Sequence, residues 1–210
     1  SKPWWSPDRW AGAKTVVGQP PAGSVDLLWA NMLLHTQSRP EDMLQQWHQA
    51  LAVDGFVMFS CLGPDTVKEM RDLYQQLGWP AAGHNLTDMH DWGDMLVHAG
   101  FAEPVMDMET ITLTFASPER LLQELRELGC NLHPQRFAGL RGRGWLAQLH
   151  AALGQHLRVE HSEGQLALTF ELVYGHAFKP APRVALEGES TVSLDQMRSM
   201  LKQGREQGLR

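Results

Sequence analysis

The chain has 210 residues and a mass of 23.6 kDa, which is enough for one domain with a substantial core. Hydrophobic residues make up 43% and charged residues 20%, which excludes a disordered chain and a coiled coil. Its net charge of −6 argues against sequence-independent binding to nucleic acid. No apolar run approaches the roughly 18 residues of a membrane span. Its two cysteines, Cys61 and Cys130, cannot form a disulfide scaffold, so we expect a cytoplasmic protein.

The first 23 residues differ in composition from the rest. Trp4, Trp5 and Trp10 stand among several prolines, which predicts an irregular, tryptophan-rich segment over residues 1–23. Such a segment either packs as a tail or docks on an apolar surface. The first residue is Ser1 rather than Met, so we expect a processed, tagged or truncated chain.

A strand, a helix and a second strand are predicted next. The short apolar run over residues 24–30 predicts a strand buried on both faces. Ser38 and Glu41 have the spacing of a capping box and predict a helix that ends before Asp54–Gly55. Residues 56–59 predict a second buried strand. Short links between such elements indicate one βαβ unit with parallel strands.

The remaining residues up to 179 complete an α/β domain over residues 24–179, with a helical insertion over residues 116–165 before the last strand. The predicted elements are a helix over 66–78 with Thr66 and Glu69 as a capping box, a helix over 88–98 capped by Asp88, one or two antiparallel strands over 105–115, a helix over 118–128 capped by Ser117, a turn over 130–143, a helix over 145–157, and a strand over 166–178. Residues 180–210 are predicted to be a linker and a final helix that begins near Ser193.

Polar residues follow the first predicted strand. In parallel sheets, ligands bind at the carboxyl ends of the strands, which is where Asn31 and His35 lie. A stacking aromatic side chain, Trp29, together with an amide suits a cofactor that carries adenine. The alternative is that Trp29 belongs to the core and Asn31 to a turn.

No metal site is predicted. His84, Asp88, His90 and Asp91 lie close together in the chain, but Asp88 is needed as a helix cap and the spacing matches no metal motif. The glycine motifs of phosphate-binding loops and of nucleophile elbows do not occur either.

A basic segment interrupts the acidic chain. Between residues 128 and 159 there are four arginines and no acidic residue, namely Arg136, Arg141, Arg143 and Arg158. Arginine suits bidentate recognition of carboxylate or phosphate. The segment therefore predicts contact with an acidic protein, a phosphopantetheine arm or a free carboxylate, unless it is only a solvated face.

Several separated motifs resemble those of class I S-adenosylmethionine-dependent methyltransferases. Residues 24–35 resemble the fourth strand of that family and residues 55–69 its fifth strand and next helix. Residues 88–94, 99–101, 104–107, 125–129 and 173–177 are similar to the malonyl-[acyl-carrier protein] O-methyltransferase family of biotin synthesis (the BioC family).

The resemblance implies a Rossmann-like, mostly parallel sheet of seven strands that ends in an antiparallel pair. It also implies methyl transfer from S-adenosylmethionine to the free carboxylate of malonyl-acyl carrier protein, with the carrier protein or a small carboxylate as partner. A carboxylate needs no general base, so we assign no catalytic residue. The cofactor would be bound by Trp29, Asn31 and His35, and the substrate by Arg141, Arg143, Tyr174 and His176.

This family begins with a strand, a glycine-rich loop and an acidic residue that holds the ribose, which together need roughly 80–100 residues. Neither the glycine-rich loop nor the acidic residue is found before Ser24. We therefore expect a domain shortened at its N-terminus that binds the cofactor poorly by itself. The alternatives are a non-catalytic scaffold or assembly module that has lost cofactor binding, a relative of the mitochondrial assembly factors that modify protein arginines, and an unrelated α/β protein. An open edge strand would favour a homo-oligomer.

Overall fold

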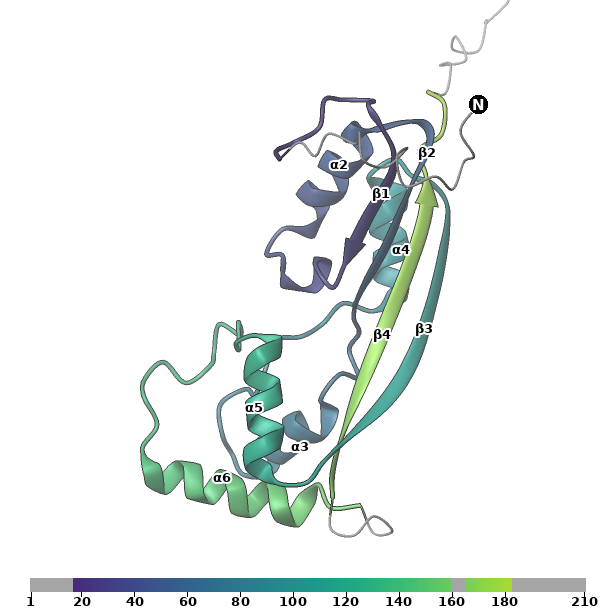
Figure 1. Ribbon diagram of the computed structural model, residues 1–210. Coiled ribbons are helices and arrows are strands. Elements are labelled where there is room, and N and C mark those ends of the chain that lie inside the picture. Colours follow the sequence, from purple (N-terminus) through teal and green to yellow (C-terminus); the bar gives the residue numbers. More distant parts are fainter. Residues whose placement is uncertain (1–16, 160–164, 183–210) are drawn as a thin grey trace, which may run out of the picture. The chain divides into compact units, whose positions relative to one another are not determined.

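The computed structural model describes residues 17–159 and 165–182 (Figure 1). The elements in chain order are β1 (Val25–Asn31), η1 (Leu34–Thr36), α2 (Pro40–Ala50), β2 (Leu51–Leu62), α3 (Lys68–Gln76), α4 (Met89–His98), β3 (Ala102–Phe115), α5 (Pro118–Leu128), α6 (Arg143–His156) and β4 (Leu166–Phe178). Residues 1–16 of the expected tryptophan-rich segment lie outside the described residues, and so does the helix expected near Ser193.

The four strands form one sheet in the order β1-β2-β4-β3. β1 and β2 are parallel, whereas β4 is antiparallel to both β2 and β3. Figure 1 shows β3 and β4 running side by side as long, curved strands. The predicted α/β class, the parallel first pair and the antiparallel pair at the end are confirmed, and α5 and α6 form the helical insertion before the last strand. Of the seven strands that the resemblance implied, the described residues supply four.

Two groups of buried side chains hold these elements together. In the first, α2 and α4 pack on one face of the sheet, with Leu44, Val57 and Leu96 fully buried. In the second, α3, α5 and α6 pack around the far end of β4, with Leu121 and Leu153 fully buried. Each fully buried leucine contributes about 2 kcal/mol through the hydrophobic effect.

The expectation that the first strand is buried on both faces is wrong. The side chain of Trp29 is 74% exposed and that of Leu27 is 48% exposed, whereas Ala30 is 5% exposed. Because α2 and α4 cover only one face, alternate residues of β1 point into the core and into solvent. β1 is also the edge of the described sheet.

On the exposed face, three apolar side chains and one histidine form a row that crosses all four strands. Trp29 of β1 lies opposite Met58 of β2, Met58 opposite His176 of β4, and His176 opposite Val105 of β3. Met58 is 46% and Val105 62% exposed. We call these four residues the apolar row.

The first helix differs from its prediction at both ends. The N-cap of α2 is Arg39, which makes no capping hydrogen bond with its side chain, so the predicted capping box of Ser38 and Glu41 is wrong. Pro40 starts the helix instead, since its fixed backbone angle suits the first helical turn. The helix ends at Ala50 because Leu51 already belongs to β2, and Asp54–Gly55 lies within that strand.

The predicted capping box at α3 is also wrong. Val67, in the left-handed region at φ 50°, is the N-cap. Thr66 instead exchanges two hydrogen bonds of 3.1 Å with the backbone of Glu171, and the carboxylate of Glu69 accepts one of 3.1 Å from the backbone N–H of Thr169. Both side chains therefore tie α3 to β4, because tertiary partners outcompete the local cap.

The other two predicted caps are confirmed. Asp88 accepts a hydrogen bond of 2.8 Å from the backbone N–H of His90, at the start of α4. Ser117 accepts one of 3.3 Å from the backbone N–H of Arg120, at the start of α5.

Candidate functional site

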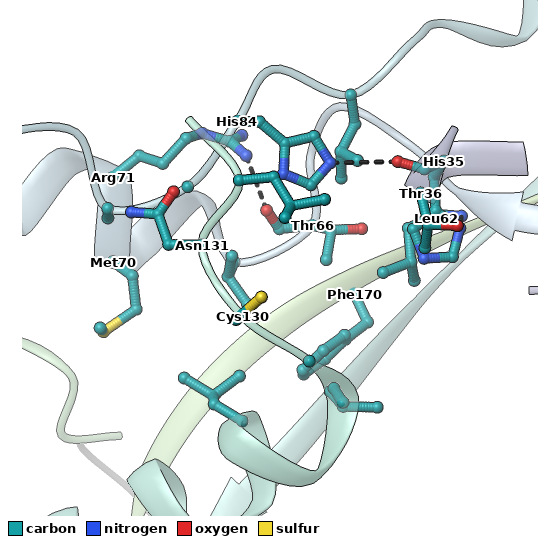
Figure 2. Close-up of a pocket in the computed structure, with 18 of the residues that line it drawn as sticks. His35, Thr36, Leu62, Thr66, Met70, Arg71, His84, Cys130, Asn131 and Phe170 are labelled. Atoms are coloured by element: carbon teal, nitrogen blue, oxygen red, sulfur yellow. Dashed lines mark hydrogen bonds between the residues drawn. The ribbon is translucent and has the colours of Figure 1, made fainter. Parts of the chain in front are cut away.

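A cavity of about 650 Å³ opens beyond the carboxyl ends of β1 and β2. Its walls come from η1, the end of β2, the start of α3, the segment 82–86, Phe170 of β4 and the end of α5 with the residues that follow it (Figure 2). Most of the lining is apolar, including Leu62, Met70, Leu122 and Leu125. Such a cavity is large enough for a small ligand.

His35 follows β1 and lies in the cavity wall. Its Nδ1 accepts a hydrogen bond of 3.3 Å from the backbone N–H of Leu62, which leaves the proton on Nε2. Burial lowers the pKa of His35 below its usual value, and the nearby His84 lowers it further. His35 is therefore neutral at pH 7 and keeps one N–H donor, on Nε2.

His84 connects two walls of the cavity. Figure 2 shows its ring directed at the backbone carbonyl of His35, with Nε2 3.1 Å from the carbonyl oxygen. A carbonyl only accepts, so Nε2 of His84 carries the proton. This bond joins the segment between α3 and α4 to the turn that follows β1.

Two arginines line the cavity, and they differ in their partners. Arg71 donates one hydrogen bond of 2.7 Å to the carbonyl of Thr66 and a second to the carbonyl of Pro64. Arg126 lies in the last turn of α5, and no hydrogen bond or ion pair of its side chain is found within residues 17–159 and 165–182.

The charge of the cavity is opposite to that of the chain. Its described lining contains two arginines, two histidines and no aspartate or glutamate, although the chain carries a net charge of −6. An apolar cavity with cationic groups and no carboxylate suits a ligand that is partly apolar and carries a negative charge.

Known proteins are similar to most of this chain. No protein-family model matches it. The malonyl-[acyl-carrier protein] O-methyltransferase of Gallionella capsiferriformans is 41% identical over 172 residues, which is 81% of this chain and 58% of that protein. The enzyme of the same name from Laribacter hongkongensis is 40% identical over 163 residues, or 77% of this chain and 54% of that protein. The chain is a homologue of the malonyl-[acyl-carrier protein] O-methyltransferases.

The resemblance predicted from the sequence is therefore confirmed. The chain spans somewhat more than half the length of these O-methyltransferases. Among solved structures, the YcgJ protein of Bacillus subtilis aligns with a TM-score of 0.47 and 10% identity, over 77% of this chain and 67% of that one.

Of the residues that the resemblance assigned to the cofactor of the O-methyltransferases, His35 alone is among those lining the described cavity. Asn31, the last residue of β1, accepts a hydrogen bond from the hydroxyl of Ser60 at the same end of β2. Trp29 lies two residues earlier on the same side of β1, with its indole exposed.

The arginines assigned to the substrate lie away from the cavity. The guanidinium of Arg141 stacks on Trp145 at 3.9 Å from the ring centroid and lies 4.7 Å from that of Phe137. These contacts anchor the segment 130–142 to the start of α6. Arg143 is the exposed first residue of α6.

Tyr174 and His176, also assigned to the substrate, lie on the exposed face of the sheet. The Tyr174 hydroxyl donates a hydrogen bond to the carboxylate of Glu109, and this bond raises the pKa of Tyr174. His176 belongs to the apolar row, and its ring packs against that of Phe178 with the ring centroids 4.7 Å apart. Neither residue lines the cavity.

Sequence reasoning missed Arg126 and Arg71 as cavity residues. Arg126 belongs to the motif over residues 125–129 that carried part of the resemblance, and this was the one signal available. Nothing in the spacing of Arg71 and Arg126 indicates that α3 and α5 meet around one cavity. Within the described residues there is no cluster of histidine, cysteine or acidic side chains that could hold a metal, and no helix long and apolar enough to cross a membrane.

Proposed function

We propose that this chain supplies the acceptor side of an S-adenosylmethionine-dependent methyltransferase that esterifies the free carboxylate of malonyl-acyl carrier protein, in the cytoplasm and in biotin synthesis. The observation that carries the proposal is the cavity beyond the parallel pair β1 and β2, which is apolar, contains cationic groups and has no carboxylate in its described lining. The names of the 41% and 40% identical relatives support the choice of acceptor.

The reaction needs the methyl donor and the acceptor carboxylate to be aligned, and it needs no general acid or base. S-adenosylmethionine, when bound, supplies a methyl group on a positively charged sulfur. A carboxylate oxygen forms the new O–C bond while the S–C bond breaks and leaves its electron pair on sulfur, so no proton moves. The residues of this chain therefore act by holding the acceptor carboxylate and by excluding water.

The described residues fit one side of that cofactor. Trp29 offers an exposed aromatic face, and the hydrogen-bonded pair of Asn31 and Ser60 offers polar groups at the carboxyl ends of two parallel strands. His35 adds a neutral N–H donor next to them along the chain. We infer that these residues face the adenosine part of the cofactor.

The basic segment suits the carrier protein. Arg136 and Arg143 are exposed, and Arg136 lies in the irregular segment that follows α5, close in sequence to the cavity-lining residues Cys130 and Asn131. Exposed arginines attract an acidic partner over distances of about 10 Å at ordinary salt. We infer that the carrier protein approaches this side while its pantetheine arm reaches the cavity.

An assay of methyl transfer tests the proposal. The longest natural reading frame that contains this sequence is incubated with malonyl-acyl carrier protein and S-adenosylmethionine labelled in the methyl group. Label in a base-labile ester of the acyl group is the expected result. Binding of the malonyl thioester without transfer, together with no heat of S-adenosylmethionine binding in calorimetry, would favour the non-catalytic scaffold instead.

A further inference from the structure

We propose that Arg126 is the specificity-determining residue of the cavity, and that its guanidinium pairs with the free carboxylate of the acyl group. The inference rests on the proposed function, because it names how the acceptor of that reaction is recognised. It goes further in separating Arg126 from the other arginine and the two histidines of the cavity, Arg71, His35 and His84.

A carboxylate that enters this cavity leaves water for walls formed largely by leucine, methionine and phenylalanine side chains. Removing a carboxylate from water is costly unless a hydrogen-bonded cation replaces the lost hydration. The cavity must therefore offer a charged donor to any acyl group that ends in a carboxylate.

Of these four basic residues, three already have partners. Arg71 donates to the carbonyls of Thr66 and Pro64, which close the turn before α3. His84 donates its Nε2–H to the carbonyl of His35 at 3.1 Å. His35 accepts from the backbone N–H of Leu62 through Nδ1 and carries no charge at pH 7.

Arg126 is placed differently. It lies in the last turn of α5, is exposed to solvent, and is among the residues that line the cavity. Its acidic neighbours on the helix are used elsewhere, because Glu124 pairs with Arg120 and Glu127 accepts a hydrogen bond from Gln123. Within the described residues, Arg126 is thus the fully charged side chain of the cavity lining for which no hydrogen bond or ion pair is found, and the planar fork of its guanidinium matches the two oxygens of a carboxylate.

Two thioesters that differ in one carboxylate separate this role from general packing. Binding of malonyl-pantetheine and of acetyl-pantetheine to the 210-residue chain is measured by calorimetry without S-adenosylmethionine. The unsubstituted chain should prefer malonyl-pantetheine. Arg126→Gln should weaken malonyl-pantetheine about fivefold and leave acetyl-pantetheine within about twofold, since an ion pair made by an exposed arginine contributes up to about a fivefold gain in affinity.

Arg126→Lys keeps the positive charge but loses the planar fork. Its affinity for malonyl-pantetheine should fall between those of the unsubstituted chain and Arg126→Gln. Arg39→Gln is the matched control, because Arg39 is an exposed arginine that precedes α2 and does not line the cavity, and it should leave both affinities unchanged. A preference for malonyl-pantetheine that survives Arg126→Gln, equal weakening of both thioesters, or no preference in the unsubstituted chain would each overturn the inference. The proposed function can fail while this inference holds. In that case the preference for malonyl-pantetheine depends on Arg126, but no labelled methyl group is transferred.

Discussion

Nε2 of His84 lies 3.1 Å from the backbone carbonyl oxygen of His35. This hydrogen bond connects residues 49 positions apart and joins two walls of the cavity. Both histidines line the cavity, yet each is bonded through a nitrogen whose role is set by a backbone group. They shape the site, whereas the charge that it offers comes from an arginine.

Replacing His84 should loosen this wall. His84→Ala removes the bond to the carbonyl of His35 and should lower the free energy of unfolding by about 1 kcal/mol, the usual net value of one hydrogen bond. His84→Gln provides an amide N–H at the end of its side chain and should restore part of the lost free energy of unfolding. Urea unfolding of the three proteins measures the difference, and equal midpoints for all of them would show that the bond does not stabilise the fold.

Stability should fall as the pH drops below 7. Burial lowers the pKa of both His35 and His48, so the folded state holds them neutral while the unfolded state takes up protons near pH 6.5. Their contribution is complete above that pH and is lost as the pH falls through the lowered values. Thermal unfolding between pH 8 and pH 5 should show this loss, and His35→Gln should make it shallower. An unchanged slope in His35→Gln would contradict the assignment to His35.

Gly175 should be intolerant of a side chain. A Cβ built there would lie 2.2 Å from the ring of Phe59, which is packed in the core. Gly175→Ala should therefore destabilise the protein by about 1–3 kcal/mol through overpacking. The matched control is Gly154→Ala in α6, where a Cβ meets nothing within 4 Å and alanine is the better helix former by about 1 kcal/mol. Opposite shifts of the denaturation midpoint are expected, and a Gly175→Ala protein as stable as the unsubstituted one would refute this packing.

The two thiols should react at very different rates. Cys61 is fully buried in β2 and burial raises its pKa to about 12, whereas Cys130 is exposed at the cavity. A thiolate is the reactive form, so one thiol per chain should react with an aromatic disulfide under native conditions and two in denaturant. Because Cys130 lines the cavity, its modification should also block malonyl-pantetheine, and Cys130→Ser should be protected from that block. Fast reaction of Cys61 in the native protein would contradict the structure.

The exposed face of the sheet should promote self-association. Leu27 and the apolar row leave large side chains in solvent beside the edge strand β1. Leu27→Thr combined with Trp29→Thr should shift the isolated chain toward smaller species in analytical ultracentrifugation. Leu140→Thr, which changes an exposed leucine outside the sheet, is the control. If the double variant sediments as the unsubstituted chain does, this face is not where the copies meet.

Local patterns in the sequence predicted most of the elements. The strand over 166–178 and the helix over 118–128 have the predicted bounds, because turn residues and helix caps mark their ends. The predicted caps failed at Ser38 and Thr66. Thr66 and Glu69 find partners on β4, about 100 residues away in the chain, and no local spacing reveals such partners.

In the site, too, local sequence patterns predicted some residues, and only the tertiary structure placed the others. The place of His35 beyond a parallel strand follows from the order of apolar runs and breaks along the chain, because such runs and breaks mark where strands end. That Arg126 reaches the cavity while Arg141 stacks on Trp145 depends on how α3, α5 and α6 pack around β4. Periodicity along a chain reports which residues share one helix or strand, but which elements meet is settled by side chains that are far apart in sequence and close only after folding.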